Sequence, residues 1–326
     1  MYVGSSEDAA DPTAPPGWFT DALTDPGEHG EVMVDGARIA HTTWGDPSDP
    51  VVVLVHGGAA HRGWWAPLAP LLARGHRVAA LDLSGHGDSD HRASYHPATW
   101  ADEVLAVAAA AGDTRPTVVG HSMGGFVAIV AAAEHGERLH GAMVLDSPIR
   151  RPDPETEEGR REGRGMFSAP KAYPDLATAK AHFHLVPPQP SRNPWLLDHI
   201  AEHSVRPVDD GQGGTAWRWK FDPGLFVHRT GPRDSSDYAA KLAAAACRLA
   251  YVHGERSAIV DDEVVTYIRE LVAGSPAAAA GVPIVEVPDA HHHLLLDEPL
   301  ATVTAIRTLL ATWPPVGTPP PLPGAS

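Results

Sequence analysis

The chain has 326 residues and is acidic, with 25 lysine and arginine residues against 41 aspartate and glutamate residues and a formal net charge of −16. A surface this negative repels phosphate backbones and anionic headgroups, which argues against nucleic acid and membranes as partners. The 43% hydrophobic content is typical of a globular protein, and the single cysteine, Cys247, excludes a disulfide framework within the chain and any multi-cysteine metal site.

The two ends of the chain differ in composition from its centre. Residues 1–28 are rich in proline, aspartate, glycine and alanine without a sustained period, so we expect a flexible N-terminal arm. Residues 314–326 contain six prolines and predict a disordered tail. The first residues lack the basic start and apolar run of a signal peptide, and no apolar window approaches the roughly 20 residues that span a bilayer. We therefore expect a cytoplasmic protein.

Strand-like and helix-like segments fill the region between these ends. Residues 31–34 and 38–44, separated by Asp35-Gly36, predict an antiparallel hairpin, and the valine and leucine run Val51–Val55 predicts a strand buried on both faces. The later segments alternate in period: helix 68–74, strand 77–83, helix 100–111, strand 117–119, helix 123–135 and strand 142–145, then helix 238–246, strand 249–253, helix 262–273, strand 284–287 and helix 299–312.

Repeated strand–helix–strand units predict a mostly parallel, doubly wound α/β sheet with helices on both faces. Residues 29–147 and 236–313 carry this alternation and form the expected core. Residues 148–235 interrupt it with charged residues, prolines and scattered aromatics. We expect an inserted, mainly helical lid domain there, over the carboxyl ends of the strands, where open α/β sheets bind ligands.

The pattern G-x-S-x-G occurs at Gly120-His121-Ser122-Met123-Gly124, between the predicted strand 117–119 and the following helix. A strand that turns abruptly into a helix crowds its neighbours, and the two glycines remove the Cβ atoms that would clash. The turn raises the Ser122 hydroxyl above the helix N-terminus, where unpaired N–H groups and the helix dipole favour negative charge. This context favours a nucleophile over a chance glycine-rich turn.

Three further segments follow predicted strands in a set order. They are His56-Gly57-Gly58, the D-x-x-G-x-G-x-S loop from Asp82 to Ser89, and Ala290-His291-His292-His293 with Asp297 and Pro299 five and seven residues beyond His292. Over about residues 31–147 and 236–313 this order resembles the α/β-hydrolase superfamily. The resemblance implies the α/β-hydrolase fold, with Ser122 as nucleophile and His292 as general base. It also implies an oxyanion hole made by the N–H groups of Gly58 and Met123.

A second hypothesis makes His291, His292 and His293 a metal tract, since imidazole is a common metal ligand. Adjacent histidines on one loop rarely converge on one ion, and the sequence shows no complementary carboxylate cluster. We therefore expect neither a metal nor a cofactor, and we choose His292 as the base from its offset to Asp297.

The catalytic acid is where the sequence departs from the resemblance. In most of the superfamily it follows the penultimate strand in a G-x-x-D turn, but here that turn reads Gly254-Glu255-Arg256-Ser257. A triad still needs a carboxylate to orient its imidazole. Some members carry the acid after the strand that follows the nucleophile helix, and Asp146 at that place is our predicted acid. The alternatives are Asp146 as a cap of the following turn, and Glu255, Asp261 or Asp262 as the acid.

Four tryptophans are candidate substrate-binding residues. Trp64 follows the oxyanion loop closely and would wall an acyl pocket, and the insertion supplies the other three, Trp195, Trp217 and Trp219. Apolar ligand pockets favour aromatic side chains, but packing in the core or within the insertion is an equal alternative for these residues.

The sequence thus predicts a serine hydrolase that cleaves a small carboxylic ester or lactone through an acyl-enzyme. The enzymatic alternative is hydrolytic cleavage of a carbon–carbon bond in diketone-like substrates, which the same triad supports. The non-enzymatic alternative is a ligand-binding protein that has lost activity, because Ser257 replaces an expected catalytic group. The sequence leaves the substrate and the oligomeric state open.

Overall fold

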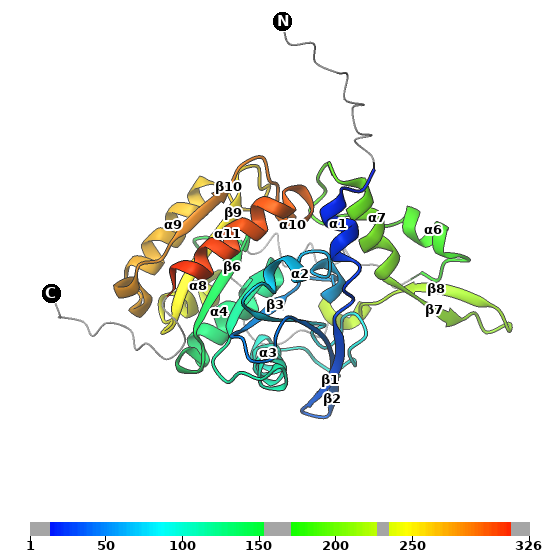
Figure 1. Ribbon diagram of the computed structural model, residues 1–326, viewed down its shortest axis with the longest axis horizontal. Coiled ribbons are helices and arrows are strands. Elements are labelled where there is room, and N and C mark those ends of the chain that lie inside the picture. Colours follow the sequence, from blue (N-terminus) through cyan, green and yellow to red (C-terminus); the bar gives the residue numbers. More distant parts are fainter. Residues whose placement is uncertain (1–13, 153–170, 227–234, 314–326) are drawn as a thin grey trace, which may run out of the picture.

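The computed structural model describes residues 14–152, 171–226 and 235–313, which build one central sheet and the helices around it (Figure 1). The strands of this sheet are β1 (Glu28–Val34), β2 (Ala37–Trp44), β3 (Val51–Val55), β4 (Arg77–Leu81), β5 (Thr117–His121), β6 (Gly141–Leu145), β9 (Arg248–Gly254) and β10 (Ile284–Val287). Their order across the sheet is β1-β2-β4-β3-β5-β6-β9-β10. The pairs β1–β2 and β2–β4 are antiparallel and the others are parallel, which confirms the expected mostly parallel α/β sheet.

The central strand β3 shows why a run of apolar residues folds into this sheet. All of its residues are valine or leucine and all are buried. Because successive side chains of a strand point to opposite faces, Val51, Val53 and Val55 join one hydrophobic cluster, and Val52 and Leu54 join the other. Each face therefore needs a cover of helices.

Two groups of helices supply that cover. The cluster on the Val53 face includes α3 (Pro97–Ala111), α4 (Met123–Glu134), α8 (Ser235–Ala243) and α9 (Asp262–Ala273). The cluster on the Leu54 face includes α2 (Ala69–Leu72), α10 (Leu294–Asp297) and α11 (Pro299–Thr312). Short 3₁₀ helices also occur, at η1 (Arg62–Trp64), η2 (Gly136–Arg138), η4 (Pro223–Phe226) and η5 (Pro276–Ala280).

The insertion between β6 and α8 lies at one end of the sheet (Figure 1). Its described part contains α6 (Leu176–Ala181), α7 (Pro194–His203) and an antiparallel pair, β7 (Val205–Asp209) and β8 (Thr215–Trp219). The expectation of a mainly helical insertion is therefore incomplete. The turn between β7 and β8 contains Gly211 and Gly213, both at positive φ. Glycines between two strands are a sequence signal for a hairpin, because glycine adopts positive φ readily.

The N-terminal segment 1–28 also differs from the flexible arm that we expected. Residues 1–13 lie outside the described part, but α1 (Gly17–Ala22) is a helix and β1 begins within the segment. Phe19 of α1 is buried, with its ring centroid 4.5 Å from that of Trp195 in α7. Figure 1 shows α1 beside α7. Helix α1 is thus packed against the insertion, because Phe19 gives it an apolar anchor.

Two further expectations concern the chain end and membranes. The predicted tail, residues 314–326, lies outside the described residues. Within the described ranges, no helix has the length and apolar character needed to cross a membrane.

Candidate active site

Ser122 lies at the sharp turn between β5 and α4, with φ 55° and ψ −117°, a backbone conformation that is strained for a residue with a side chain. A Cβ atom on Gly120 would clash with the Gly124 carbonyl oxygen, and one on Gly124 would clash with the Val55 carbonyl oxygen. The two glycines are therefore needed for this turn. The Ser147 hydroxyl donates a hydrogen bond of 2.7 Å to the Ser122 carbonyl oxygen and helps to hold the turn in place.

The structure brings Ser122, His292 and Asp146 together from three different strand ends. His292 Nε2 lies 3.1 Å from Ser122 Oγ, and His292 Nδ1 lies 2.8 Å from Asp146 Oδ1. Ser122 is half-buried, whereas the other two residues are buried. If the Nδ1–H group donates to Asp146, the Nε2 lone pair is left to accept the Ser122 proton.

The Asp146 carboxylate accepts further hydrogen bonds from the loop after β9. The Gly254 N–H donates to Oδ2 over 2.8 Å, and the Ser257 hydroxyl donates to Oδ1 over 2.6 Å. Ser257 Oγ in turn accepts from the Val260 N–H at 3.1 Å. The serine found where an aspartate is expected therefore forms a hydrogen bond to Asp146, the predicted acid. Sequence reasoning identified Ser257 only as a departure from the usual turn and missed this contact, because its partner lies 111 residues away.

The other candidate acids bind elsewhere. The Glu255 carboxylate is exposed and accepts the Asp289 N–H at 2.7 Å. Asp261 caps α9 through the Val264 N–H and pairs with Arg150 at 2.8 Å. Asp262 is exposed in the first turn of α9. Asp146 is the carboxylate that contacts His292 within the described part of the chain.

His121, inside the serine motif, holds the loop that carries His292. Its Nε2–H group donates a hydrogen bond of 2.9 Å to the His292 carbonyl oxygen. Burial lowers the pKa of His121 to about 3, so the ring is neutral at ordinary pH and keeps a lone pair on its other nitrogen. The motif position was the signal for this residue, but its partner could not be read from sequence because it lies 171 residues away.

A cavity of about 240 Å³ opens beside Ser122. Gly58 and Met123, the predicted oxyanion donors, both line it. Neither of their N–H groups donates a hydrogen bond to another residue in the described ranges. Apolar side chains form much of the remaining wall, and they are Ala60, Trp64, Phe126, Pro148, Val186 and Ile259.

The four candidate tryptophans separate into two groups. Trp64 is buried and lines the cavity, as expected. The other three are absent from its lining among the described residues. Trp195 packs on Phe19, and Trp219 contacts Phe183 with ring centroids 6.0 Å apart. Trp217 pairs through its main chain with Tyr173 at 2.8 Å. A substrate-binding role for these three therefore stays a prediction, and their described contacts are packing contacts.

The three adjacent histidines point to different partners. His291 Nδ1 lies 2.9 Å from Asp297 Oδ2, and His292 contacts Ser122 and Asp146. His293 lines the cavity. A metal tract made of these three side chains alone is therefore not formed.

Comparisons with known proteins identify similar chains. The model of the family described as alpha/beta hydrolase fold matches residues 50–299. A serine hydrolase-like protein of Danio rerio is 31% identical over 180 residues, or 52% of this chain and 55% of that protein. The match thus spans little more than half of that relative. An esterase of Mycobacterium tuberculosis is 27% identical over 290 residues, or 86% of this chain and 88% of the esterase.

Solved structures also share the arrangement. The thioesterase domain from the curacin biosynthetic pathway matches with a TM-score of 0.68 and 24% identity, over 87% of this chain and 99% of that domain. At this level of identity the likeness shows a common fold.

Proposed function

The chain belongs to the alpha/beta hydrolase fold family, and we propose that it is a serine hydrolase that cleaves carboxylic esters or lactones through an acyl-enzyme. The observation that carries this proposal is the hydrogen-bonded series from Ser122 through His292 to Asp146 at the wall of a cavity. The similarity to an esterase over most of both chains adds support for an ester as substrate.

In the proposed acylation step, Ser122 Oγ attacks the carbonyl carbon of the ester while His292 Nε2 accepts the hydroxyl proton. The buried Asp146 carboxylate stabilises the imidazolium that forms. The carbonyl oxygen becomes an oxyanion, which the N–H groups of Gly58 and Met123 would bind. The intermediate then collapses, the leaving alkoxide oxygen takes the proton from His292 to give the alcohol, and the acyl group stays on Ser122.

In the proposed deacylation step, His292 takes a proton from a water molecule, which attacks the acyl-enzyme carbonyl carbon. A second oxyanion forms at the same N–H groups, and its collapse returns the proton to Ser122 Oγ and releases the carboxylic acid. The same three side chains therefore serve both half-reactions.

We infer a short, apolar acyl group from the cavity. Its volume of about 240 Å³ lies below the ~300–1,000 Å³ of drug-sized ligand sites. Its lining includes Trp64, Phe126 and Ile259 and no ionised side chain opposite Ser122 among the described residues. Val186, from the insertion, closes part of the wall, which supports a lid role for that segment.

The decisive experiment is labelling of the full chain with a fluorophosphonate, which reacts with activated serine hydroxyls. We expect stoichiometric labelling of the native protein and none of Ser122→Ala. Hydrolysis is then measured on esters of increasing acyl length, on lactones and on a diketone panel, with Ser122→Ala as the blank. Absence of labelling would favour a ligand-binding protein, and turnover of diketones alone would move the proposal to carbon–carbon hydrolysis.

A further inference from the structure

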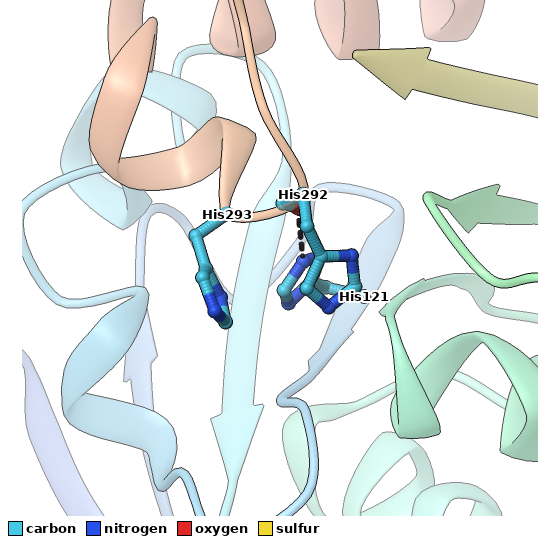
Figure 2. A group of neighbouring side chains, drawn as sticks. All are labelled: His121, His292 and His293. Atoms are coloured by element: carbon cyan, nitrogen blue, oxygen red, sulfur yellow. Dashed lines mark hydrogen bonds between the residues drawn. The ribbon is translucent and has the colours of Figure 1, made fainter. Parts of the chain in front are cut away.

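Two aromatic side chains with polar atoms meet in the wall of the cavity beside Ser122. They are His293, on the loop after β10, and Trp64, at the end of η1, and their ring centroids are 5.5 Å apart. Figure 2 shows the His293 ring projecting from the same loop as His292, apart from the hydrogen bond that joins His121 to that loop. The two rings thus lie near the nucleophile without belonging to the proposed triad.

Both side chains carry polar atoms that lack a partner. The two ring nitrogens of His293 and the indole Nε1–H of Trp64 are covered by neighbouring atoms, and none of them forms a hydrogen bond within the described residues. The amide nitrogen of Gln189, whose Oε1 accepts the His293 main-chain N–H at 2.8 Å, is also buried without a partner. Buried polar groups are usually hydrogen-bonded, so this cluster is an exception that a ligand would explain.

The chemistry of these groups limits what they can bind. Burial lowers the pKa of His293 well below its usual value, and the main chain of Pro187 and Val186 opposes this only in part. The ring is therefore neutral at ordinary pH, with one N–H donor and one lone pair. Those main-chain carbonyls can accept only its single N–H, so the other nitrogen stays an acceptor. The indole of Trp64 and the amide nitrogen of Gln189 are donors.

A hydroxyl group matches this combination, because it donates its proton to the histidine lone pair and accepts from the indole N–H. A carboxylate does not match. It has no proton to donate, and the described lining of the cavity contains no lysine or arginine that would offset the burial of its charge. An apolar group would leave the lone pair and the indole N–H unsatisfied.

We propose that His293 and Trp64 form a subsite for a hydroxyl group on the acyl part of the substrate, so that hydroxyacyl esters are the preferred substrates. This specificity rests on the proposed function and refines its apolar acyl group by one polar atom. The carbon chain would pack on Phe126 and Ile259, which line the same cavity, while the hydroxyl reaches the two rings. No hydrogen bond holds the His293 ring nitrogens, so the ring can turn its lone pair toward the cavity without losing one.

The subsite lies close to the carbonyl that Ser122 would attack. The ring centroid of His293 is 4.7 Å from that of His292, and His292 Nε2 is 3.1 Å from Ser122 Oγ. Because one ring separates the subsite from the nucleophile, we expect the hydroxyl on one of the first carbons beyond the ester carbonyl.

Steady-state kinetics on matched methyl esters tests the subsite. The 2-hydroxy and 3-hydroxy esters of pentanoic acid are compared with the 2-methyl and 3-methyl esters, in which a methyl group of similar size replaces the hydroxyl. For at least one position we expect kcat/KM of the native protein to be roughly 5- to 100-fold higher for the hydroxy ester, since each of two hydrogen bonds contributes about two- to tenfold. Ratios near one at both positions would overturn the proposal.

Substitutions assign the preference to the two rings. His293→Leu and His293→Phe remove both ring nitrogens and should bring the hydroxy-to-methyl ratio close to one. Trp64→Phe keeps an aromatic ring but loses one donor, and should lower the ratio by about two- to tenfold. The ratio decides, because a merely disturbed site would slow both esters alike. Thermal melting checks that each variant is folded, and a preference that persists in both His293 variants would overturn the subsite.

The matched control is Phe126→Leu, which changes the apolar wall of the same cavity. It should shift kcat/KM for both esters in parallel and leave their ratio at the native value, because it removes no hydrogen bond. A ratio that collapses in Phe126→Leu as it does in His293→Leu would refute the assignment to His293. The methyl ester of 3-oxopentanoic acid gives a second control. If it were favoured as strongly as the hydroxy esters, the cluster would act through donors alone, and the hydroxyl would be the wrong ligand.

Binding to Ser122→Ala separates the subsite from the proposed hydrolysis. Ligand-observed NMR measures the affinity of the full-length variant for the hydroxy and methyl esters without turnover. We expect the hydroxy ester to bind more tightly, and the difference to vanish when His293→Leu is added. Native protein that cleaves both esters equally well would refute the subsite alone. Native protein that fluorophosphonate does not label would refute the proposed hydrolysis, and the NMR affinities would still decide the subsite.

Discussion

The cavity beside Ser122 and a second cavity differ less in volume than in how far their polar groups are paired. The second cavity, of about 470 Å³, is larger than the first, of about 240 Å³. Four of its charged side chains are paired with one another. Arg62 pairs with Asp82 and Asp88, and Lys220 pairs with Asp88 at 3.0 Å. His61 likewise bonds through Nε2 to the Ser204 hydroxyl at 3.0 Å.

The smaller cavity contains groups that the described part of the protein leaves unsatisfied. Ser122 has a strained backbone, the N–H groups of Gly58 and Met123 have no acceptor, and the ring nitrogens of His293 have no partner. Strain and missing partners are costly unless a ligand or a reaction uses them. The larger cavity also contains one unpartnered buried nitrogen, His199 Nε2, but its main charged groups are paired. The comparison teaches that the candidate active site combines a strained serine with several unpartnered groups, whereas the larger cavity is mainly a structural junction.

The sharpest way to break this comparison is to remove the charge of Asp146. Asparagine has nearly the same side-chain shape as aspartate and tolerates the left-handed φ of 49° at this position. It lacks the negative charge that stabilises a protonated His292 ring. We expect kcat to fall by about 10⁴-fold with the fold retained, because His292 loses its orientation and the stabilisation of its charged form. Steady-state kinetics on the best ester measures the loss.

The control for Asp146→Asn is Asp261→Asn, which changes a carboxylate that caps α9. It should leave kcat within about twofold of the native value, because surface ion pairs and caps act on stability. Equal losses of kcat in the two variants would remove Asp146 from the triad.

Arg62→Met, in the larger cavity, should have the opposite effect to Asp146→Asn: it should lower stability and leave kcat unchanged. Asp82 is fully buried and pairs with the Arg62 guanidinium, so the substitution leaves a buried carboxylate without its cation. We expect the free energy of unfolding to fall by about 3–5 kcal/mol, or roughly 10²–10⁴-fold in the folding equilibrium. The kcat of the molecules that remain folded should be unchanged. Urea unfolding and active-site labelling separate the two quantities.

Lys220→Met is the matched control for Arg62→Met in the same cavity. Its partner Asp88 is 42% exposed, so water replaces the lost cation and the expected cost is below about 1 kcal/mol. A large loss of kcat in Arg62→Met at full stability would give the larger cavity a catalytic role after all.

Short-range patterns explain how much of the molecule was predictable. The β3 run and the alternation around it indicated the sheet, because burial on two faces forces apolar residues into adjacent positions. The glycines around Ser122 indicated the turn for a local steric reason. Asp146 and His292 came from the resemblance to the α/β-hydrolase superfamily, and their places after strands fit it, since parallel strands end at one edge of a sheet.

The contacts that could not be predicted from sequence join residues far apart along the chain. The contact of Ser257 with Asp146 joins residues 111 apart, and that of His121 with His292 joins residues 171 apart. The tryptophans of the insertion were ambiguous because an apolar ring suits a ligand pocket and a small core equally. Phe19 fixes α1 on Trp195, a packing that no local period announces.

The pH dependence of stability gives a third, smaller test of the larger cavity, which His61 lines. Burial, reinforced by the charge of Lys220, holds the pKa of His61 well below its ordinary value of 6.5. As pH falls below 6.5 the unfolded chain binds a proton that folded His61 does not, so stability is lost as pH falls and is fully present above that value. Between pH 7.5 and 5.5 this residue should contribute a loss of up to about 1.4 kcal/mol, or tenfold.

The contribution of His61 is measured by comparing urea unfolding of the native protein and His61→Gln at the two pH values. The glutamine variant should lose less stability on acidification than the native protein. His182→Gln, at an exposed position beside α6, should follow the native pH dependence. Identical pH dependences for native protein and His61→Gln would contradict a neutral, buried His61.

The smallest expected effect is that of substituting Ser257. Its hydroxyl is hydrogen-bonded to the Asp146 carboxylate, so it supports a proposed catalytic residue without taking part in the reaction itself. Ser257→Ala removes one of the hydrogen bonds to the Asp146 carboxylate, while those from the Gly254 N–H and His292 remain. A single such bond contributes about 0.5–1.5 kcal/mol, so kcat should fall by roughly two- to tenfold with KM unchanged.

In the double variant Asp146→Asn/Ser257→Asp, a carboxylate returns to a position near the His292 ring. We expect it to recover part of the activity lost in Asp146→Asn, because His292 needs a nearby negative charge and not one particular strand end to supply it. Activity no higher than that of Asp146→Asn would mean that the backbone at Asp146, and not the charge alone, sets the orientation of the ring.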